Sequence, residues 1–237
     1  MDSDLKDKHI VVTGGTGELG RAVVEALVAA GATCHVPHRG QTAPDGLRAA
    51  LGPAARQLHL VGDVDLTSEP EVTSFYARLP TLWASVHAAG GFAAAEVTNT
   101  ALVDLRFQID MNLTTSFLCC REAVRKMVAA AAGGGRIVNV ASRAALEPKG
   151  GSTAYSIAKA GVVTLTQCLA DEVKARGILV NAVVPSIIDT PANRRAMPNA
   201  RHDLWPKPAQ IAATIVWLCR PQNQLVSGAV LPVYGQV

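Results

Sequence analysis

Short runs of β-branched and other apolar residues alternate along this chain with longer stretches in which apolar residues recur at helical spacing. The short runs predict strands over residues 9–12, 33–36, 57–61, 85–88, 136–140, 178–184 and 229–233. The longer stretches predict helices over residues 19–30, 69–79, 100–132, 153–176 and 209–218. Gly31 and Gly177 stand where helix C-caps are expected, and Gly133-Gly134-Gly135 is expected to end the long third helix.

The repeated alternation of strand and helix favours one architecture. Each strand returns to a parallel partner through a right-handed crossover, which places helices on both faces of the sheet. We therefore predict an α/β fold of the Rossmann type, a doubly wound three-layer α/β/α sandwich with a parallel sheet of about seven strands. Without repeats or linkers, residues 1–237 are expected to form a single domain. Residues 186–208, with four of the thirteen prolines, are expected to be an irregular surface segment.

The composition excludes several classes of protein. With 49% hydrophobic and 17% charged residues, the chain is expected to fold around a real core. A formal net charge of +3 without a basic run argues against nucleic acid as a partner. Five cysteines without a Cys-x-x-Cys pair argue against disulfides and a zinc site and indicate a reducing compartment. The polar N-terminus and the absence of an apolar run of about 18 residues predict a cytoplasmic protein with neither signal peptide nor membrane span.

A glycine-rich loop lies between the first predicted strand and the first predicted helix, with the sequence Thr13-Gly14-Gly15-Thr16-Gly17-Glu18-Leu19-Gly20. Glycines there permit a tight turn and let backbone N–H groups approach a pyrophosphate at the positive end of the helix. The loop therefore predicts a dinucleotide site, in which we expect contacts from Gly14, Thr16, Gly17, Glu18 and Leu19. An ordinary strand-to-helix turn is the alternative interpretation.

The end of the second predicted strand bears on the choice between NAD and NADP. A carboxylate there would bind the ribose hydroxyls of NAD and repel the 2′-phosphate of NADP, but the sequence has Pro37-His38-Arg39 instead. The Arg39 guanidinium could bind a 2′-phosphate, or it could be a solvated surface residue. Because Glu18 places a negative charge in the glycine loop, NADP(H) is favoured only slightly over NAD(H). Asp63 and Val64 are expected near the adenine, with a turn as the alternative role for Asp63.

A candidate proton-transfer group consists of residues that follow the fifth predicted strand. Tyr155 and Lys159 stand at positions i and i+4, and therefore on one face of a helix. A neighbouring ammonium lowers a phenol pKa from its usual value of about 10, so Tyr155 could exchange a proton with an alcohol or carbonyl. Ser142, at the carboxyl end of that strand, could hold the same substrate oxygen. Asn112 lies in the long predicted helix. A buried amide there needs hydrogen-bond partners, which are an ordered water or, if the residue is purely structural, protein groups.

Taken together, these motifs resemble the short-chain dehydrogenase/reductase family of single-domain size. The resemblance rests on the glycine loop, Asn112, Ser142, Tyr155-x-x-x-Lys159 and Pro185-Ser186-Ile187-Ile188-Asp189-Thr190, in this order. It implies hydride transfer between a nicotinamide and a small carbonyl or alcohol substrate, with Tyr155 as general acid/base and Ser142 orienting the substrate oxygen. It also implies that Lys159 lowers the Tyr155 pKa and binds the nicotinamide ribose, while Asn112 holds a water that links Lys159 to solvent.

The same resemblance implies the remaining contacts and an assembly. Further cofactor-binding residues are expected after the fourth and sixth strands, namely Ala89, Gly90, Pro185, Ile188 and Thr190. Relatives commonly form homotetramers or homodimers through the helix around Asn112 and the helix that carries Tyr155. Apolar residues that would extend these two helix surfaces are Leu113, Phe117, Val124, Met127, Val163, Leu165 and Leu169.

The sequence departs from the family pattern at three places. Glu18 replaces the middle glycine of the usual loop, and Ser186 replaces the glycine of the usual Pro-Gly pair. The family's Asn-Asn-Ala-Gly reads His87-Ala88-Ala89-Gly90, so the clamp that the asparagines provide is missing.

The substrate itself cannot be read from the sequence. Residues 190–206 combine apolar side chains with Arg194, Arg195 and Arg201, which is compatible with an apolar or mildly anionic carbonyl compound. The alternative function is a nucleotide-binding regulator or redox sensor without turnover, which would have no need of the proton-transfer group.

Overall fold

A seven-stranded parallel sheet forms the centre of the protein, with the strand order β3-β2-β1-β4-β5-β6-β7. The computed structural model describes residues 4–41, 45–130 and 134–237. The strands are β1 (His9–Thr13), β2 (Thr33–Pro37), β3 (Leu58–Val61), β4 (Ala84–His87), β5 (Gly135–Val140), β6 (Ile178–Pro185) and β7 (Val230–Val233). Every pairing is parallel, with Ile10 opposite Cys34 on one side and opposite Ala84 on the other. The predicted fold class is confirmed.

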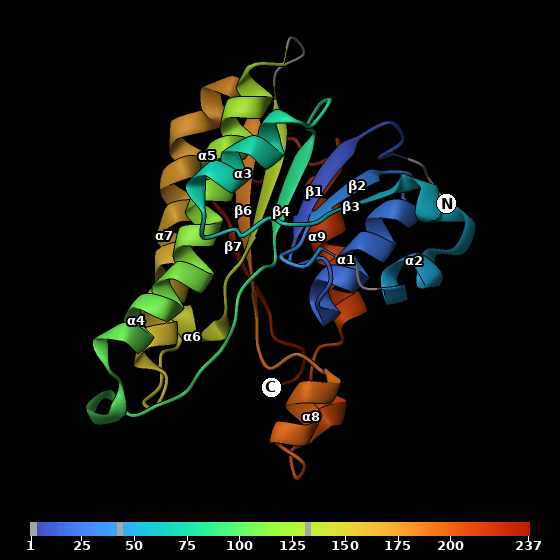
Figure 1. The fold of residues 1–237 in the computed structure, drawn as a ribbon. Coiled ribbons are helices and arrows are strands. Elements are labelled where there is room, and N and C mark those ends of the chain that lie inside the picture. Colours follow the sequence, from blue (N-terminus) through green and yellow to red (C-terminus); the bar gives the residue numbers. More distant parts are fainter. Residues whose placement is uncertain (1–3, 42–44, 131–133) are drawn as a thin grey trace.

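Helices cover both faces of the sheet (Figure 1). One face carries α1 (Glu18–Ala29) and α9 (Pro208–Cys219), with α2 (Asp45–Leu51) at its edge. The other face carries α3 (Glu69–Ala77), α5 (Thr115–Val128) and α7 (Thr153–Val173). Smaller elements lie beyond the carboxyl ends of the strands, namely α4 (Leu102–Ile109), α6 (Arg143–Leu146) and α8 (Pro191–Ala196). Because the strands are parallel, their carboxyl ends share one edge of the sheet, where the polar and glycine-rich segments also meet.

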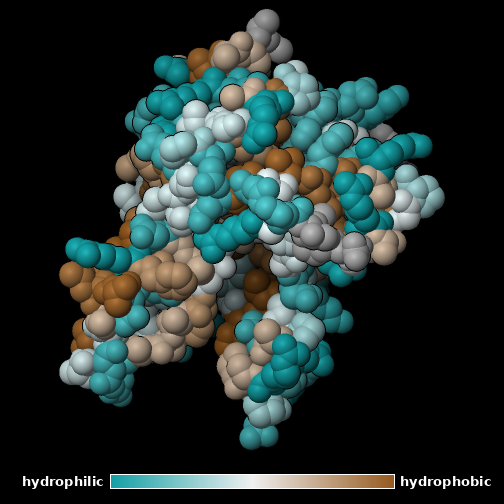
Figure 2. Space-filling view, in the orientation of Figure 1, coloured by the Kyte–Doolittle hydropathy of each residue, from teal (hydrophilic) through white to brown (hydrophobic). Residues whose placement is uncertain are grey.

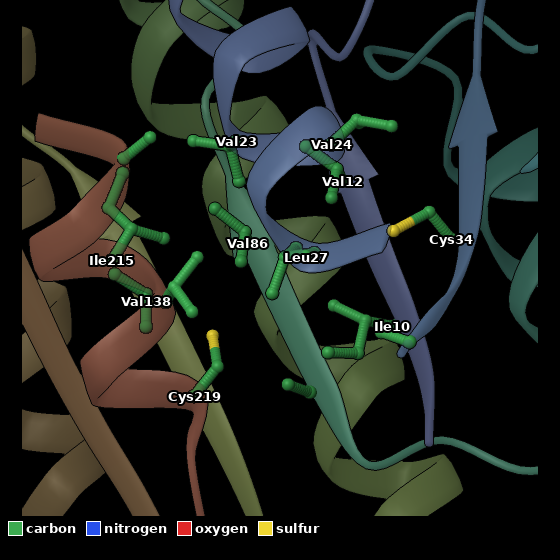
Figure 3. Packing of buried hydrophobic residues seen from close by; sticks show 14 of the residues in the cluster. Ile10, Val12, Val23, Val24, Leu27, Cys34, Val86, Val138, Ile215 and Cys219 are labelled. Carbon is green, nitrogen blue, oxygen red and sulfur yellow. The ribbon is translucent and has the colours of Figure 1, made fainter. Parts of the chain in front are cut away.

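The apolar runs of the strands are buried against both helical layers. On one face, Val12, Val86 and Val138 pack against Leu27 of α1 and Ile215 of α9 (Figure 3). On the other face, Val11, Ile137 and Val180 contact a second cluster from α3, α5 and α7. A strand that is buried on both faces needs an unbroken apolar run, and this is the pattern that made the strands recognisable in the sequence.

The long third helix is the main departure from the prediction. It is divided into α4, a π-helical turn η3 (Asp110–Thr114) and α5, which ends at Val128. Its C-cap is Ala129 and not the glycine run, of which Gly135 is the first residue of β5. Ala132 and Gly133 lie outside the described residues. A π-turn commonly marks a functional site, and this one carries Asn112.

Short elements were missed because they lack a periodic pattern. The predicted irregular segment 186–208 contains α8 and a 3-10 turn, η5 (His202–Leu204), and Arg143–Leu146 forms the single-turn helix α6. Gly31 and Gly177 do follow helices with left-handed backbone, at φ values of 96° and 69°. Among the described residues, no helix is long and apolar enough to cross a membrane. The described part of the chain also holds no cluster of three or more histidine, cysteine or acidic residues suited to a metal ion.

Candidate active site

Two clefts open at the carboxyl edge of the sheet. One, of about 500 Å³, is lined by residues that follow β5 and β6, and Figure 2 shows the surface hollowed there, between α8 and the ends of α4 and α7. The other, of about 380 Å³, is lined by the glycine loop and by residues that follow β2 and β4. We call them the substrate cleft and the nucleotide cleft. Their positions match the expected binding edge of a doubly wound sheet.

Ser142 and Tyr155 both line the substrate cleft. Ser142 is the N-cap of α6, where its Oγ accepts a hydrogen bond of 3.3 Å from the backbone N–H of Ala144. Tyr155 lies in the first turn of α7, and the ring of Phe92 packs edge-on against it with a centroid distance of 5.0 Å. Burial raises the pKa of Tyr155, while a hydrogen bond with Ser142 acts in the opposite direction. The tyrosine is therefore protonated at neutral pH and suited to donate a proton.

Lys159 is buried one helical turn after Tyr155. Its ammonium donates a hydrogen bond of 2.9 Å to the carbonyl oxygen of Val140, and it lies 5.9 Å from the centre of the Tyr155 ring. Desolvation lowers the pKa of Lys159 to about 8. In the protein alone, burial therefore raises the pKa of Tyr155 instead of the expected lowering, and the Lys159 ammonium donates to Val140.

Asn112 is fully buried in the π-turn, and protein groups satisfy its amide. Its Nδ2 donates to the carbonyl oxygens of Gly91 at 3.0 Å and Gln108 at 3.1 Å, and its Oδ1 accepts from the N–H of Gly91 at 3.2 Å. A Cβ on Gly90 would lie 2.6 Å from Asn112 Oδ1 and 3.3 Å from Lys159 Nζ. Asn112 thus holds the loop after β4 beside Lys159. Its amide bonds to protein groups, as expected for a structural amide.

The glycine loop is packed so closely against the neighbouring backbone that it needs glycine at two positions. Gly14 has a φ of 66°, and a Cβ there would lie 2.6 Å from the backbone nitrogen of Ala89. A Cβ on Gly20 would lie 2.1 Å from the Gly14 carbonyl oxygen, so both positions require glycine. No side chain caps the N-terminus of α1 at Gly17. The free amides of a twelve-residue helix beside the nucleotide cleft fit a pyrophosphate.

The predicted cofactor residues divide into two groups. The nucleotide cleft is lined by Gly14, Thr16, Gly17, Arg39, Val64, Ala89 and Gly90, and Ile188 lines the substrate cleft with Tyr155. Six predicted residues line neither cleft, namely Glu18, Leu19, Asp63, Lys159, Pro185 and Thr190. Asp63 has a φ of 56°, as expected for a turn residue, and Thr190 caps α8 by accepting from the N–H of Asn193 at 3.2 Å. Pro185 ends β6 opposite Val233.

Arg39 lines the nucleotide cleft, but it has a partner of its own. Its Nη2 lies 3.2 Å from Oδ1 of Asp65, with 60% of the arginine side chain exposed. Asp65 is held in turn by Thr67, whose N–H donates to Asp65 at 2.9 Å. A 2′-phosphate at Arg39 would have to compete with this exposed ion pair, which by itself contributes little stability.

His87 stands where the family pattern has an asparagine, and its side chain joins β4 to β5. Its imidazole lies 2.8 Å from both Ser85 Oγ and Asn139 Oδ1, and Asn139 Nδ2 donates to Thr166 Oγ1 at 2.9 Å. These bonds join β4 to β5 and α7. Desolvation lowers the pKa of the buried His87 to about 4, so it is neutral. This structural role of His87 was not predicted from the sequence, because a histidine before Ala88 gives no periodic or spacing signal.

Several residues of the substrate cleft were also missed. They lie on short elements without a sequence signature and comprise Phe92, Arg143, Glu147, Lys149, Ser152, Ile187 and Asn193. Ser186 does enter the cleft, as expected of a side chain in place of glycine, and its hydroxyl donates to the Tyr234 carbonyl oxygen at 2.6 Å. Met197 lines the cleft, whereas Trp205 is buried.

Comparisons with known proteins agree with this geometry. The profile of the family described as short chain dehydrogenase matches residues 8–201. The chain is 32% identical to a 2,5-dichloro-2,5-cyclohexadiene-1,4-diol dehydrogenase of Sphingobium indicum, covering 98% of each chain. It is 33% identical to a cis-4-hydroxycyclohexanecarboxylate dehydrogenase of Sinomonas cyclohexanicum, covering 99% of this chain and 98% of the other. A short-chain type dehydrogenase/reductase from Mycobacterium ulcerans superimposes with a TM-score of 0.86 at 27% identity, over 98% of this chain and 90% of the other.

Proposed function

Because this chain belongs to the short-chain dehydrogenase family and is an NAD(P)-dependent oxidoreductase, we propose that it interconverts a secondary alcohol on a small carbocycle and the corresponding ketone. The observation that supports the ring is the substrate cleft, in which Phe92, Ile187 and Met197 form apolar walls beside the Ser142 and Tyr155 hydroxyls. Two relatives are named for alcohols on six-membered carbocycles. A regulator without turnover has no comparable support.

In this mechanism, Tyr155 donates a proton to the ketone oxygen in reduction and accepts it from the alcohol in oxidation. Ser142 orients the same oxygen, because its hydroxyl lies with Tyr155 on one wall of the cleft. Lys159 holds a positive charge beneath the site and reaches the loop after β4, where Asn112 keeps Gly90 and Gly91 in place. The nicotinamide cofactor supplies or accepts the hydride when it is bound.

The glycine loop, Val64, Ala89 and Gly90 would hold the adenosine and pyrophosphate of the cofactor, and Ile188 would contact the carboxamide. Thr190 is assigned to the carboxamide by the family resemblance alone. We also propose, from the sequence, a single domain and a cytoplasmic protein. Free thiols support the reducing compartment, since Cys34, Cys119, Cys120 and Cys219 are buried and unpaired.

A panel of cyclic secondary alcohols and their ketones, followed by the absorbance of the reduced nicotinamide, tests the reaction. Cyclohexanol and cyclohexanone derivatives should turn over faster than linear alcohols of the same carbon number. Faster turnover of the linear compounds would contradict the carbocyclic substrate.

We further propose that NADP(H) is preferred slightly over NAD(H), through Arg39. Arg39→Ala should weaken NADPH binding at least tenfold, because a charge-assisted bond at a partly exposed site contributes roughly 1.5–3 kcal/mol. The matched variant Asp65→Asn removes the competing carboxylate 3.2 Å from Arg39 and should strengthen NADPH binding. Isothermal titration of each variant with NADPH and NADH measures both effects. If Arg39→Ala weakened the binding of NADPH and NADH equally, Arg39 would not bind the 2′-phosphate.

The α4 surface supports a proposed homotetramer or homodimer. Large apolar side chains are exposed on and beside α4, including Leu102, Val103 and Phe107, and Phe117 of α5 is 48% exposed. Figure 2 shows apolar residues gathered over this side of the molecule. Of the residues named from the sequence, Met127 is buried in the core and cannot contribute.

Light scattering should therefore give a mass of at least twice the 24.7 kDa of one chain at micromolar concentration. Phe107→Glu should lower this mass, because it buries a charge in the proposed contact. An unchanged monomeric mass in the parent protein would refute the assembly.

A further inference from the structure

The charged residues of the substrate cleft are not those that the sequence singled out. Arg194 forms a bidentate pair with Asp189, and Arg201 pairs with Asp203 at 2.8 Å, so both guanidinium groups are committed outside the cleft lining. The charged side chains that do line the cleft are Arg143, Glu147 and Lys149.

Arg143 follows Ser142 directly in the chain and is held in place from two sides. Its guanidinium lies over the ring of Tyr234 at 4.8 Å from the centroid, and its Nε and Nη2 lie 2.8 Å and 2.7 Å from Oε2 of Glu147. Glu147 occupies only this edge of the guanidinium. The third nitrogen, Nη1, has no hydrogen-bond partner within the described part of the chain, and 34% of the side chain is exposed.

The support for Arg143 is itself anchored. The Tyr234 carbonyl oxygen accepts from the Ser186 hydroxyl at 2.6 Å, which ties the segment after β7 to the segment after β6. Residues after β5, β6 and β7 thus hold the guanidinium in one position. An arginine held this way loses little conformational entropy when it binds a ligand, and its planar fork matches a carboxylate.

The cleft therefore has three kinds of surface. Ser142 and Tyr155 present hydroxyls for the reacting oxygen, Phe92, Ile187 and Met197 present apolar walls, and Arg143 presents a positively charged donor. A neutral carbocyclic alcohol would leave that donor unused. A ring or short chain that carries both the reacting oxygen and a carboxylate would use all three surfaces.

We propose that Arg143 binds a carboxylate of the substrate, so that this enzyme acts on small hydroxy- or oxo-carboxylates with an apolar body. The inference rests on the proposed function for the reacting oxygen, but it concerns a different group of the substrate. Glu147 and Tyr234 are positioning residues, because they hold the guanidinium in place.

A matched pair of substrates tests the proposal: 4-oxocyclohexanecarboxylate and its methyl ester, which differ in the negative charge. The parent enzyme should have a kcat/KM for the acid at least tenfold above that for the ester. Arg143→Gln should lower the acid-to-ester ratio at least tenfold, and Arg143→Lys, which keeps the charge and loses the fork, should lower it less. Arg195→Gln makes the same charge change on an exposed residue of α8 outside the cleft and should leave the ratio within threefold.

A binding measurement separates this inference from the proposed function. Cyclohexanecarboxylate has no reacting oxygen, yet its Kd by isothermal titration should rise at least tenfold in Arg143→Gln. Binding without turnover of any panel compound would overturn the proposed function and leave the carboxylate site standing. Turnover of the ester as fast as the acid in the parent enzyme, or a ratio unaffected by both Arg143 variants, would overturn the carboxylate site. Circular dichroism of each variant confirms that it is folded.

Discussion

Replacing Tyr155 by phenylalanine is expected to lower kcat by roughly 10²–10⁴-fold, the usual effect of losing a general acid. The change removes one oxygen and keeps the ring, so the edge-on contact with Phe92 at 5.0 Å is retained. Burial raises the pKa of Tyr155, which keeps its proton available for ketone reduction through the neutral range. For alcohol oxidation the phenolate is needed, and the rate should therefore rise with pH.

Stopped-flow absorbance of the reduced nicotinamide measures both directions across pH 6 to 10. In Tyr155→Phe the rise of the oxidation rate with pH should disappear together with the activity. Cofactor binding should stay within a few-fold of the parent value, which shows that the site is intact. Ser142→Ala serves as a second variant, because it removes the other hydroxyl on that wall of the cleft. Near-parental turnover in Tyr155→Phe would rule out this tyrosine as the proton donor.

Replacing Lys159 by methionine is expected to abolish most activity while making the cofactor-free protein more stable. Desolvation lowers the pKa of Lys159 to about 8, against an unfolded value of about 10.4. Below about pH 8 the buried ammonium therefore lowers the free energy of unfolding by its full amount, on the order of 3 kcal/mol. Loss of the bond to Val140 offsets about 1 kcal/mol of the gain. The free energy of unfolding at pH 7 should rise by about 1–2 kcal/mol.

The sign of the pH dependence provides the control. Between about pH 8 and 10.4 the unfolded parent chain binds a proton that the folded chain lacks, so its stability gains from rising pH. Lys159→Met lacks this group, and the difference between the two proteins should shrink toward pH 10. Urea unfolding at pH 7 and pH 10 gives both values. A variant less stable than the parent at pH 7 would show that the buried ammonium stabilises the fold.

Much of the fold could be predicted from local pattern. Strands such as β5 and β6 are buried on both faces and so read as apolar runs, while α1 and α7 show helical spacing. Prediction failed where one turn interrupts a regular stretch. The π-turn around Asn112 depends on a side chain that bonds to the Gly91 loop, and no local pattern reports a contact across 21 residues.

The sequence by itself determined the family resemblance, the fold class, and the candidates Ser142, Tyr155 and Lys159. These conclusions follow from the spacing of residues along the chain. For example, residues at positions i and i+4 of a helix lie on the same face, whatever the helix packs against. Only the tertiary structure decided which charges line the clefts and which groups are buried. It paired Arg39 with Asp65, placed Arg143 on Tyr234 and enclosed Lys159 beneath the site. Desolvation and long-range contacts set the pKa values of the buried groups and decide which hydrogen-bond donors are left for a ligand. Desolvation and these contacts both depend on segments that are distant in the chain.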